Sequence, residues 1–394
     1  MTASLIFLLL LMLGKMLDVV FPETCNSTGW FGPQCVFKCH CQTDKGEQTS
    51  CNLTSGTCYT GDRCEDGFSG TACQYTDYAF GRNTFVDTDC ITNENGSVVV
   101  DGHVDTCFEA RGKDGSNCSW FVNISAPSLV TQIIVKVPSD TPDNTSWRVL
   151  VHKDNTSGEV TLQSFTDKGI TLAYVLPRPM SVSRVQVLAP STQQLRLCEV
   201  NVVGGRNTAL KKNVSQGEET FNDTSGAEKA VDDERKRSYK DQCAVMKARN
   251  DDGQSLSAWW QVVLGPNVLV WSVEMHTNAS LKGLDVEMEL KLSNGSSMDL
   301  QSDEPRVGMA LASIPRPVPA TELHIRKKQK GDYLILCEVR VLGDCMDGYY
   351  GWLCDRRCSC SNTEAACDKM WGSCPSSVMG ETGWSTVGYR GLFV

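Results

Sequence analysis

The sequence predicts an all-β protein in which two tandem β-sandwich or jelly-roll domains lie between small disulfide-rich modules. Three observations predict it: alternating apolar and polar segments, a repeated strand sequence, and cysteines concentrated near both ends of the chain. Alternation with a period of two is typical of strands with one buried face, and no comparable amphipathic helix stands out. The alternating segments are VTQIIVKV, SWRVLVHK, VSRVQVLA, VLVWSVEM, LDVEMELKL and ELHIRKK.

The repeated strand reads LRLCEVNVVG from Leu195 and LILCEVRVLG from Leu334. The distance between the copies matches one compact domain rather than a solenoid repeat. Other landmarks recur in the same order: GRNTF with GRNTA, VVVDGHVDTC with KAVDDERKRSYKDQC, and SWFVNISAP with AWWQVVLGP. We therefore expect two related domains, at residues 77–204 and 205–344.

Composition indicates the compartment. The chain has 394 residues and a formal net charge of -10, which argues against a general nucleic-acid binder. Its 20 cysteines favour an oxidising compartment. The apolar run MTASLIFLLLLMLG predicts a signal peptide over residues 1–20, with an uncleaved anchor as the alternative, and no later stretch approaches a transmembrane length. We expect a secreted, extracellular protein or the ectodomain of a longer membrane receptor.

Eleven Asn-x-Ser/Thr sequons agree with passage through the secretory route, because this motif is the acceptor of N-linked glycans. The sequons begin at Asn26, Asn52, Asn95, Asn117, Asn123, Asn144, Asn155, Asn213, Asn222, Asn278 and Asn294.

The cysteine-rich ends resemble epidermal growth factor (EGF) repeats. CNSTGWFGPQC, CEDGFSGTAC and CMDGYYGWLC each place glycines and an aromatic residue between two cysteines, as the closing hairpin of that repeat does. We expect EGF-like modules at residues 21–76 and 345–394, the second without its closing hairpin. Zinc binding by the Cys-x-Cys segments is the less favoured alternative, because thiolates do not persist well in secreted proteins. The resemblance implies the pairs Cys25–Cys35, Cys39–Cys51, Cys41–Cys58, Cys64–Cys73, Cys345–Cys354, Cys358–Cys367 and Cys360–Cys374.

The cysteines of the repeated domains can be paired by matching the two copies. The match predicts that an early loop is tied to the last strand in each copy, through Cys107–Cys198 and Cys243–Cys337. Cys90 and Cys118 of the first copy then pair with each other.

Within the repeats, an Asp-Gly-like turn, a cysteine soon after it, a Trp-Trp-x-Val-x-Leu-Gly strand and the Leu-Cys-Glu-Val strand resemble the F-type lectin domain, also called the fucolectin or tachylectin-4/pentraxin-1 domain. The second copy matches best, through Trp259, Trp260, Gly265 and the strand from Leu336 to Gly343. The resemblance implies a galactose-binding-domain-like fold and carbohydrate recognition. With EGF-like flanks, the chain is similar to multi-EGF lectin receptors, which suggests roles in cell adhesion and innate immunity.

The fucose-binding residues of that family are missing in both copies. Phe108 and Ala244 follow the early cysteines, where the family has a histidine, and the later segments lack its Arg-x-Asp. Fucose recognition by the usual route is therefore not expected.

The resemblance also implies a structural calcium (Ca2+) site in each copy, since a hard cation prefers carboxylate and carbonyl oxygens. The implied ligands are Asp101 with Glu199, and Asp232 with Glu338. The alternative is that both glutamates are only polar positions on alternating strands.

A basic loop follows the Asp-Gly-like turn of the second copy. Arg235, Lys236, Arg237 and Lys240 could meet an anionic partner such as a sulfated glycan, a sialylated glycan or a lipid headgroup. A solvated loop is the favoured interpretation, because charge runs usually face water.

No catalytic motif is present. The sequence has no Gly-x-Ser-x-Gly, no His-Glu-x-x-His and no P-loop, so we expect no enzyme. Trp259 and Trp260 could form a sugar platform, but at the start of an alternating strand at least one is expected in the core. The leading hypothesis is lectin-like recognition of glycans or glycoproteins at cell surfaces. The alternative is a structural or protein-binding ectodomain of a scavenger or signalling receptor.

Overall fold

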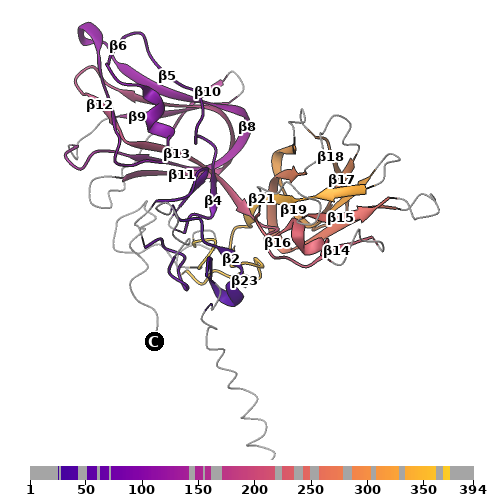
Figure 1. Cartoon of the computed structure of the whole chain (residues 1–394). Coiled ribbons are helices and arrows are strands. Elements are labelled where there is room, and N and C mark those ends of the chain that lie inside the picture. Colours follow the sequence, from indigo (N-terminus) through magenta and orange to yellow (C-terminus); the bar gives the residue numbers. More distant parts are fainter. Residues whose placement is uncertain are drawn as a thin grey trace, which may run out of the picture.

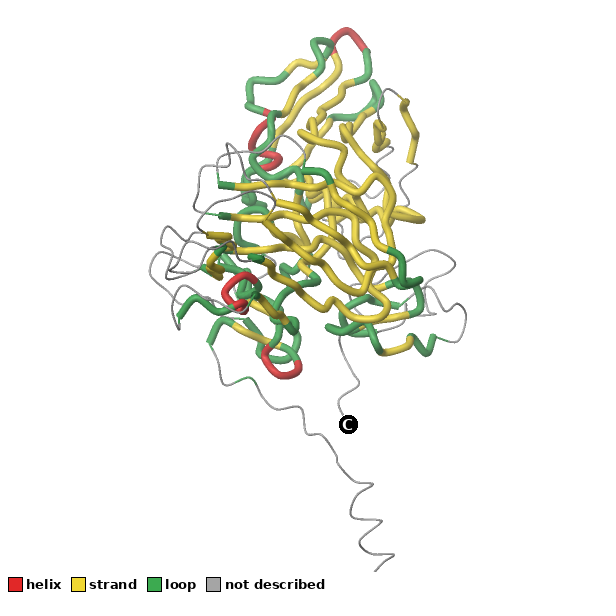
Figure 2. Tube along the Cα trace, turned by 90° about the vertical axis from the view of Figure 1, so that its right-hand side faces the viewer, coloured by secondary structure: helices red, strands yellow, loops and turns green. Residues whose placement is uncertain are grey.

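Strands dominate the computed structural model. It describes residues 25, 28–42, 51–59, 63–70, 72–141, 147–153, 156–160, 171–217, 224–234, 243–248, 257–277, 286–302, 308–327, 333–360 and 367–372. The regular elements of these residues are strands and four short 3-10 turns, with no α-helix among them (Figure 2). The all-β fold class predicted from the sequence is confirmed. No helix in the described part is long and apolar enough to cross a membrane, and the predicted signal peptide lies outside that part.

The first unit, β5 to β13, consists of a large sheet and a small sheet (Figure 1). The large sheet has the order β10-β9-β11-β8-β13 with β5 paired to β8, and the small sheet has the order β12-β7-β6. The elements are β5 (Thr84–Val86), β6 (Cys90–Ile91), η2 (Gly96–Val100), β7 (Phe108–Gly112), η3 (Lys113–Gly115), β8 (Cys118–Lys136), β9 (Arg148–Lys153), β10 (Thr156–Val160), β11 (Thr171–Ala189), β12 (Leu195–Leu197) and β13 (Glu199–Asn207).

The second unit, β14 to β21, repeats this arrangement. Its large sheet has the order β21-β16-β19-β17-β18 with β14 paired to β16, and β15 pairs with β20 in the small sheet. The elements are β14 (Val214–Gln216), η4 (Ala227–Ala230), β15 (Ala244–Lys247), β16 (Trp259–His276), β17 (Val286–Leu292), β18 (Ser297–Leu300), β19 (Met309–Lys327), β20 (Tyr333–Leu336) and β21 (Glu338–Cys345).

Each unit is a two-layer sandwich whose core lies between the sheets. In β9, Val149 and Val151 are buried while His152 faces outward, as the period-two pattern predicts. Phe108 and Leu197 of the small sheet belong to the same hydrophobic cluster as these valines. The alternating segments therefore form strands because one face of each is covered by the other layer.

One tryptophan anchors each core. Trp120 in β8 and Trp260 in β16 are fully buried. The Trp120 indole N–H donates to the Gly96 carbonyl at 2.8 Å, and the Trp260 indole N–H donates to the Ala227 carbonyl at 3.0 Å. Burial with a satisfied N–H confirms that Trp260 is a core residue and excludes it as a sugar platform, whereas Trp259 is half-buried.

The hydrogen bonds correct two landmarks of the sequence repeat. Gly81 N–H donates to Val100 O in the first unit, and Lys211 N–H donates to Val231 O in the second, so Gly81 corresponds to Lys211. GRNTF therefore corresponds to KKNVS, and the identity with GRNTA at Gly205 is wrong as a structural match. Similarly, Trp120 corresponds to Trp260, which shifts the SWFVNISAP match by one residue.

The two units join edge to edge through β13 and β21. These strands pair antiparallel at Arg206 with Gly343 and at Asn207 with Leu342, so the two large sheets become continuous. β13 thus crosses the domain boundary expected between residues 204 and 205. A Cβ atom on Gly205 would collide with the Trp271 ring, so glycine lets the two backbones approach at this crossing.

The disulfide-rich ends of the chain lie together below the two units (Figure 1). The N-terminal module (residues 25–77) and the C-terminal module (residues 345–372) share one hydrophobic cluster. In it, the Trp371 ring lies 6.2 Å from Phe31 and 6.1 Å from Phe37, measured between ring centroids. The elements are β1 (Trp30–Phe31), η1 (Pro33–Cys35), β2 (Phe37–Lys38), β3 (Phe68–Ser69), β4 (Tyr75–Asp77), β22 (Tyr349–Tyr350) and β23 (Arg356–Arg357).

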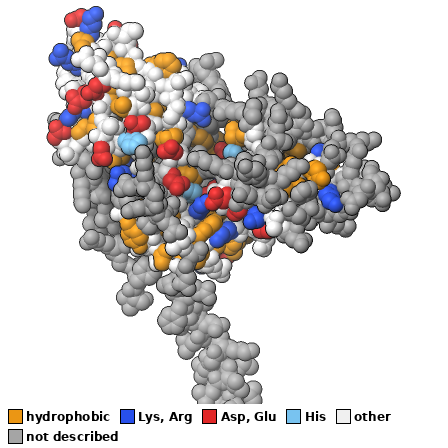
Figure 3. All heavy atoms as spheres, in the orientation of Figure 1, with side chains coloured by type: hydrophobic (Ala, Val, Ile, Leu, Met, Phe, Trp, Pro, Cys, Tyr) orange, Lys and Arg blue, Asp and Glu red, His pale blue; other side chains and the backbone are white. Residues whose placement is uncertain are grey.

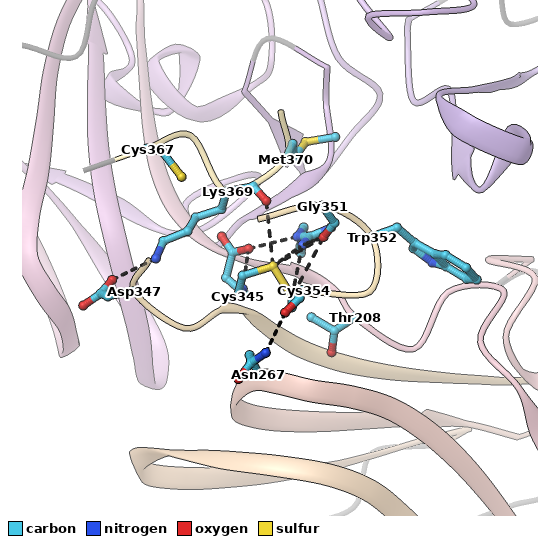
Figure 4. Close-up of a disulfide and its surroundings, with 12 residues drawn as sticks. Thr208, Asn267, Cys345, Asp347, Gly351, Trp352, Cys354, Cys367, Lys369 and Met370 are labelled. Carbon is cyan, nitrogen blue, oxygen red and sulfur yellow. Dashed lines mark hydrogen bonds and ion pairs between the residues drawn. A yellow bond between two sulfur atoms is a disulfide. The ribbon is translucent and has the colours of Figure 1, made fainter. Parts of the chain in front are cut away.

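A buried arginine fixes the C-terminal module to the end of β21. Arg206 donates from Nε to Asp344 Oδ1 at 2.9 Å and from a terminal nitrogen to Gly351 O at 2.8 Å. Around the Cys345–Cys354 disulfide, Asn267 Nδ2 donates to Cys354 O at 3.0 Å (Figure 4). The module is therefore held by charge-assisted hydrogen bonds as well as by apolar contact.

Candidate functional site

The last strand of each unit begins with a buried glutamate that directly follows a cysteine, and each glutamate faces an acidic turn. In the first unit, the Cys107–Cys198 disulfide joins the loop after the turn to the residue before β13. Glu199 follows this cysteine and is 2% exposed. The sequence predicted Glu199 beside Asp101, and the structure brings these two carboxyl groups close enough to interact electrostatically.

Asp77 joins this first acid cluster, and the sequence analysis missed it. Asn201 Nδ2 donates to Asp77 Oδ2 at 2.9 Å and to Glu199 Oε1 at 3.2 Å. Asp77 Oδ1 accepts from the Val202 backbone N–H at 2.9 Å. Glu199 Oε2 is buried and has no hydrogen-bond partner of standard geometry among the described residues, although the Gly102 backbone N–H faces the carboxylate and lowers its pKa.

Burial and mutual repulsion make this cluster hard to ionise. Burial raises the pKa of Glu199 to about 9, and the Asp77 and Asp101 carboxylates add to the rise. Burial also raises the pKa of Asp77 to about 6, against the hydrogen bonds it accepts. Lys136 lowers both pKa values by its charge, but burial and the neighbouring carboxylates outweigh it at Glu199.

The first cluster fits a hard cation by the kind of its donors. Carboxylate oxygens are suitable ligands, and the orphaned Glu199 Oε2 is a buried polar atom that a cation would satisfy. The described residues contain no group of three His, Cys, Asp or Glu side chains that converges on one point. A cation held by Asp101 and Glu199 would therefore need backbone carbonyls or water to complete its coordination.

The second unit carries the matching cluster at the start of β21. Glu338 is fully buried, and its Oε2 accepts from the Asp233 backbone N–H at 2.9 Å. Asn207 Nδ2 donates to Glu338 Oε1 at 3.4 Å. Burial raises the pKa of Glu338 well above its ordinary value, and Asp233 and Asp232 add to the rise. The predicted partners Asp232 and Glu338 are thus brought together.

Arg340 distinguishes the second cluster from the first. It takes the place that Asn201 has in the first unit, is 2% exposed, and lowers the pKa of Glu338 by its charge. Its guanidinium donates to Glu274 Oε2 at 2.6 Å and to Thr76 Oγ1 at 3.1 Å. A buried guanidinium that acts on Glu338 by its charge also opposes a metal ion electrostatically.

The N-terminal module adds two more basic side chains to the second cluster. His40 Nε2 donates to Asp233 Oδ2 at 2.7 Å, and His40 Nδ1 lies 3.3 Å from Glu65 Oε2. The imidazole stacks on Phe68 with ring centroids 3.7 Å apart. Lys38 Nζ lies 2.7 Å from Glu234 Oε1. Both ring nitrogens of His40 therefore face carboxylate oxygens.

The second cluster is therefore a contact between modules. Because His40 and Arg340 occupy its surroundings, this cluster fits a metal ion less well than the first cluster does, and calcium binding by Asp232 and Glu338 stays a prediction. Figure 3 shows acidic and basic side chains gathered on the face between the two units, above the modules. This contact could not be predicted from the sequence, since His40 stands among cysteines far from the repeats.

The remaining site predictions concern cysteines, the basic loop and sequons. Nine disulfides join pairs of described cysteines, each pair as in the sequence analysis, and none of the described cysteines is free. They are Cys25–Cys35, Cys39–Cys51, Cys41–Cys58, Cys64–Cys73, Cys90–Cys118, Cys107–Cys198, Cys243–Cys337, Cys345–Cys354 and Cys358–Cys367. Several predicted residues lie outside the described part: Cys374, Arg235, Lys236, Arg237, Lys240, Asn26, Asn144, Asn155, Asn222 and Asn278.

Comparison with known proteins finds no matching family model and no matching curated protein. Among solved structures, an f-lectin (fucolectin) from the serum of striped bass, Morone saxatilis, is 21% identical with a TM-score of 0.33, covering 69% of this chain and 99% of its own. A fucose binding module of Streptococcus pneumoniae is 18% identical with a TM-score of 0.28, covering 34% and 96%. The CBM32-1 and CBM32-2 domains of Clostridium perfringens ZmpB, in complex with GalNAc, are 10% identical with a TM-score of 0.28, covering 68% and 91%.

Proposed function

We propose that this protein is an extracellular, non-catalytic glycan-recognition protein of the F-type lectin kind, in which the first unit holds a structural calcium ion. The observation that carries the proposal is the place of Glu199. It follows the disulfide-bonded Cys198, is buried beside Asp101 and Asp77, and keeps one carboxylate oxygen without a hydrogen-bond partner among the described residues. The F-type lectin resemblance assigns calcium ligands to these same positions.

The ligand is a glycan other than fucose bound in the usual way, because both units lack the family's histidine and Arg-x-Asp segment. Anionic glycans are the best candidates. The run Arg235, Lys236, Arg237 and Lys240 follows directly on the second acidic turn and supplies positive charge in an acidic protein. The nine disulfides support an extracellular place of action.

A glycan array tests the sugar part of the proposal. The full secreted chain, rather than one unit, is applied because β13 and β21 join the two sheets. Fucosylated, sulfated and sialylated glycans are probed with calcium and with a chelator. We expect binding to anionic glycans that falls at least tenfold when Arg235, Lys236, Arg237 and Lys240 are changed to glutamine. Binding to fucose alone, or binding unchanged in that variant, would contradict the assignment.

Thermal unfolding tests the calcium part separately. A ligand that binds only the folded state raises the melting temperature, and raises it further as the free ligand exceeds its dissociation constant. We expect calcium to raise the Tm of the wild type and of Glu338→Gln, but not that of Glu199→Gln. An equal rise in Tm with calcium in the wild type and Glu199→Gln, or no rise in the wild type, would contradict a calcium site in the first unit.

The alternative function is a structural or protein-binding ectodomain. The observation in its favour is that the second acid cluster is covered by the N-terminal module through His40 and Lys38. A correctly folded chain that binds no glycan on the array would favour this alternative.

A further inference from the structure

The outer face of the first unit's large sheet carries two aromatic rings, one exposed and one partly buried. Phe85 in β5 and Phe121 in β8 are paired across the strands. Their ring centroids are 5.2 Å apart with an interplanar angle of 15°, so the rings stack. Phe85 is 44% exposed. A phenylalanine ring this open to solvent has a cost in water unless something covers it.

A sequon shares this face with the rings. Asn123 follows Phe121 by two residues in β8, so both side chains project from the same side of the sheet. Arg184 of β11 pairs with Asn123 in register, and its Nε donates to Asn123 Oδ1 at 2.8 Å. The Arg184 guanidinium carbon lies 4.7 Å from the centroid of the Phe121 ring. With Oδ1 engaged, Nδ2 of Asn123 remains for a covalent bond, and no described residue hydrogen-bonds to it.

The sequence singles out this sequon as well. Of the eleven, the one at Asn123-Ile124-Ser125 has a phenylalanine, tyrosine or tryptophan two residues before the asparagine. The fold does not require the rings, because the matching positions in the second unit are Ser215 for Phe85 and Gln261 for Phe121. The aromatic pair and the acceptor asparagine therefore occur together where neither is needed for the sandwich.

We propose that Asn123 carries an N-linked glycan whose first N-acetylglucosamine residue packs on Phe121 and Phe85. The inference rests on the secretory route of the proposed function. In the attachment step, Asn123 Nδ2 forms a bond to C1 of N-acetylglucosamine from a lipid-diphosphate-linked oligosaccharide. The C1–O bond to the diphosphate breaks, the lipid diphosphate leaves, and the amide nitrogen gives up one proton.

Because Phe121 and Phe85 lie close to Asn123, they would contact the attached glycan rather than a free saccharide. Side chains two residues apart on a strand stand about 7 Å apart, which is within reach of the first sugar on Asn123. The apolar C–H face of that sugar can cover the ring surface that is otherwise in water. Once attached, it would occupy the surface at a far higher effective concentration than any free sugar.

Glycopeptide mass spectrometry of the full chain secreted from animal cells tests attachment. We expect Asn123 to be occupied. Glycans at other sequons with an empty Asn123 would overturn the inference while leaving the secretory route intact. No glycan at any sequon would overturn the secretory route itself.

Thermal unfolding tests the packing through a double-mutant comparison. We expect Phe121→Ala to lower the Tm by roughly 2–4 °C more in the glycosylated protein than in the Asn123→Gln background. Asn294→Gln, which removes a sequon from a turn of the second unit, is the control and should not change the effect of Phe121→Ala. Where Phe121→Ala fails to fold, Phe85→Ala at the exposed edge replaces it. Equal Tm losses in both backgrounds would overturn the packing.

Discussion

The two units share a strand order, but their matching buried glutamates lie in opposite electrostatic surroundings. In the first unit, Glu199 lies with Asp77 and Asp101, and Lys136 lowers its pKa by its charge. In the second unit, Arg340 stands where the first has Asn201, and the acid at the turn, Asp233, contacts His40 of the N-terminal module. The same position can thus leave an acid cluster electrostatically unsatisfied or turn it into a contact between modules.

The largest expected effect comes from breaking the module contact. His40 and Asp233 are both nearly buried, so removing either side chain takes a close charged contact away from the other in a site with little water. We expect Asp233→Asn and His40→Ala each to lower the free energy of unfolding by about 3 kcal/mol. Urea unfolding measures the loss, and hydrogen exchange should increase over residues 28–42.

His103 of the first unit is the matched control. Its ring nitrogen lies 3.5 Å from Asp101 Oδ1, but its side chain is 56% exposed. We expect His103→Ala to change stability by less than about 0.5 kcal/mol. Equal losses from His40→Ala and His103→Ala would abolish the proposed difference between the clusters.

The pH dependence of the first cluster is the second effect in size. The folded pKa of Glu199, about 9, lies above the ordinary value of 4.5. The folded state therefore binds more protons than the unfolded state between these values, and stability falls as pH rises from 4.5 to 9. Without calcium, Glu199→Gln should remove this fall and stabilise the protein by up to about 3 kcal/mol at pH 7.

Calcium should reverse the advantage of that substitution. A bound cation favours the ionised carboxylate, so the wild type should gain stability that Glu199→Gln cannot. Chemical unfolding at pH 5, 7 and 8.5, with calcium and with a chelator, measures both effects. A wild type whose stability is flat across this range in the chelator would show that Glu199 is already compensated.

The sequence predicted local features better than contacts between modules. The Cys-Glu strands and the Asp101 and Asp232 turns could be found because the residues that form each one are consecutive. The shared GRNT motif led to a wrong structural match, because so short a motif does not determine which hydrogen bonds its residues make. Gly81 stands in a turn with a φ of 63°, whereas Gly205 lies within strand β13.

Features that depend on distant residues could not be predicted. His40 reaches Asp233 because the N-terminal module folds back against β21, a result of packing between segments separated by the whole first unit. Asp77 joins Glu199 because β4 pairs with β13. The edge pairing of β13 with β21 likewise depends on how two complete sandwiches meet, which no local pattern records.

The smallest effect concerns the outer faces of the large sheets, where the units differ again. In the second unit, Glu322 takes the place of Arg184 and accepts from His324 Nε2 at 3.0 Å and Lys291 Nζ at 2.9 Å. The His324 contact, followed by the Lys291 contact, lowers the pKa of Glu322. Their stabilisation is therefore present at neutral pH and is lost as pH falls through the lowered folded pKa.

Because the network is partly exposed, Glu322→Gln should lower stability by less than about 1 kcal/mol at pH 7, with no difference from the wild type in strong acid. Arg184→Gln in the first unit lacks such an acid-dependent difference, because its partner is the neutral amide of Asn123. Urea unfolding of both variants at pH 7 and in acid distinguishes a face stabilised by ion pairs from one stabilised by aromatic contacts. Parallel dependences of stability on pH in the two variants would show that both faces are stabilised in the same way.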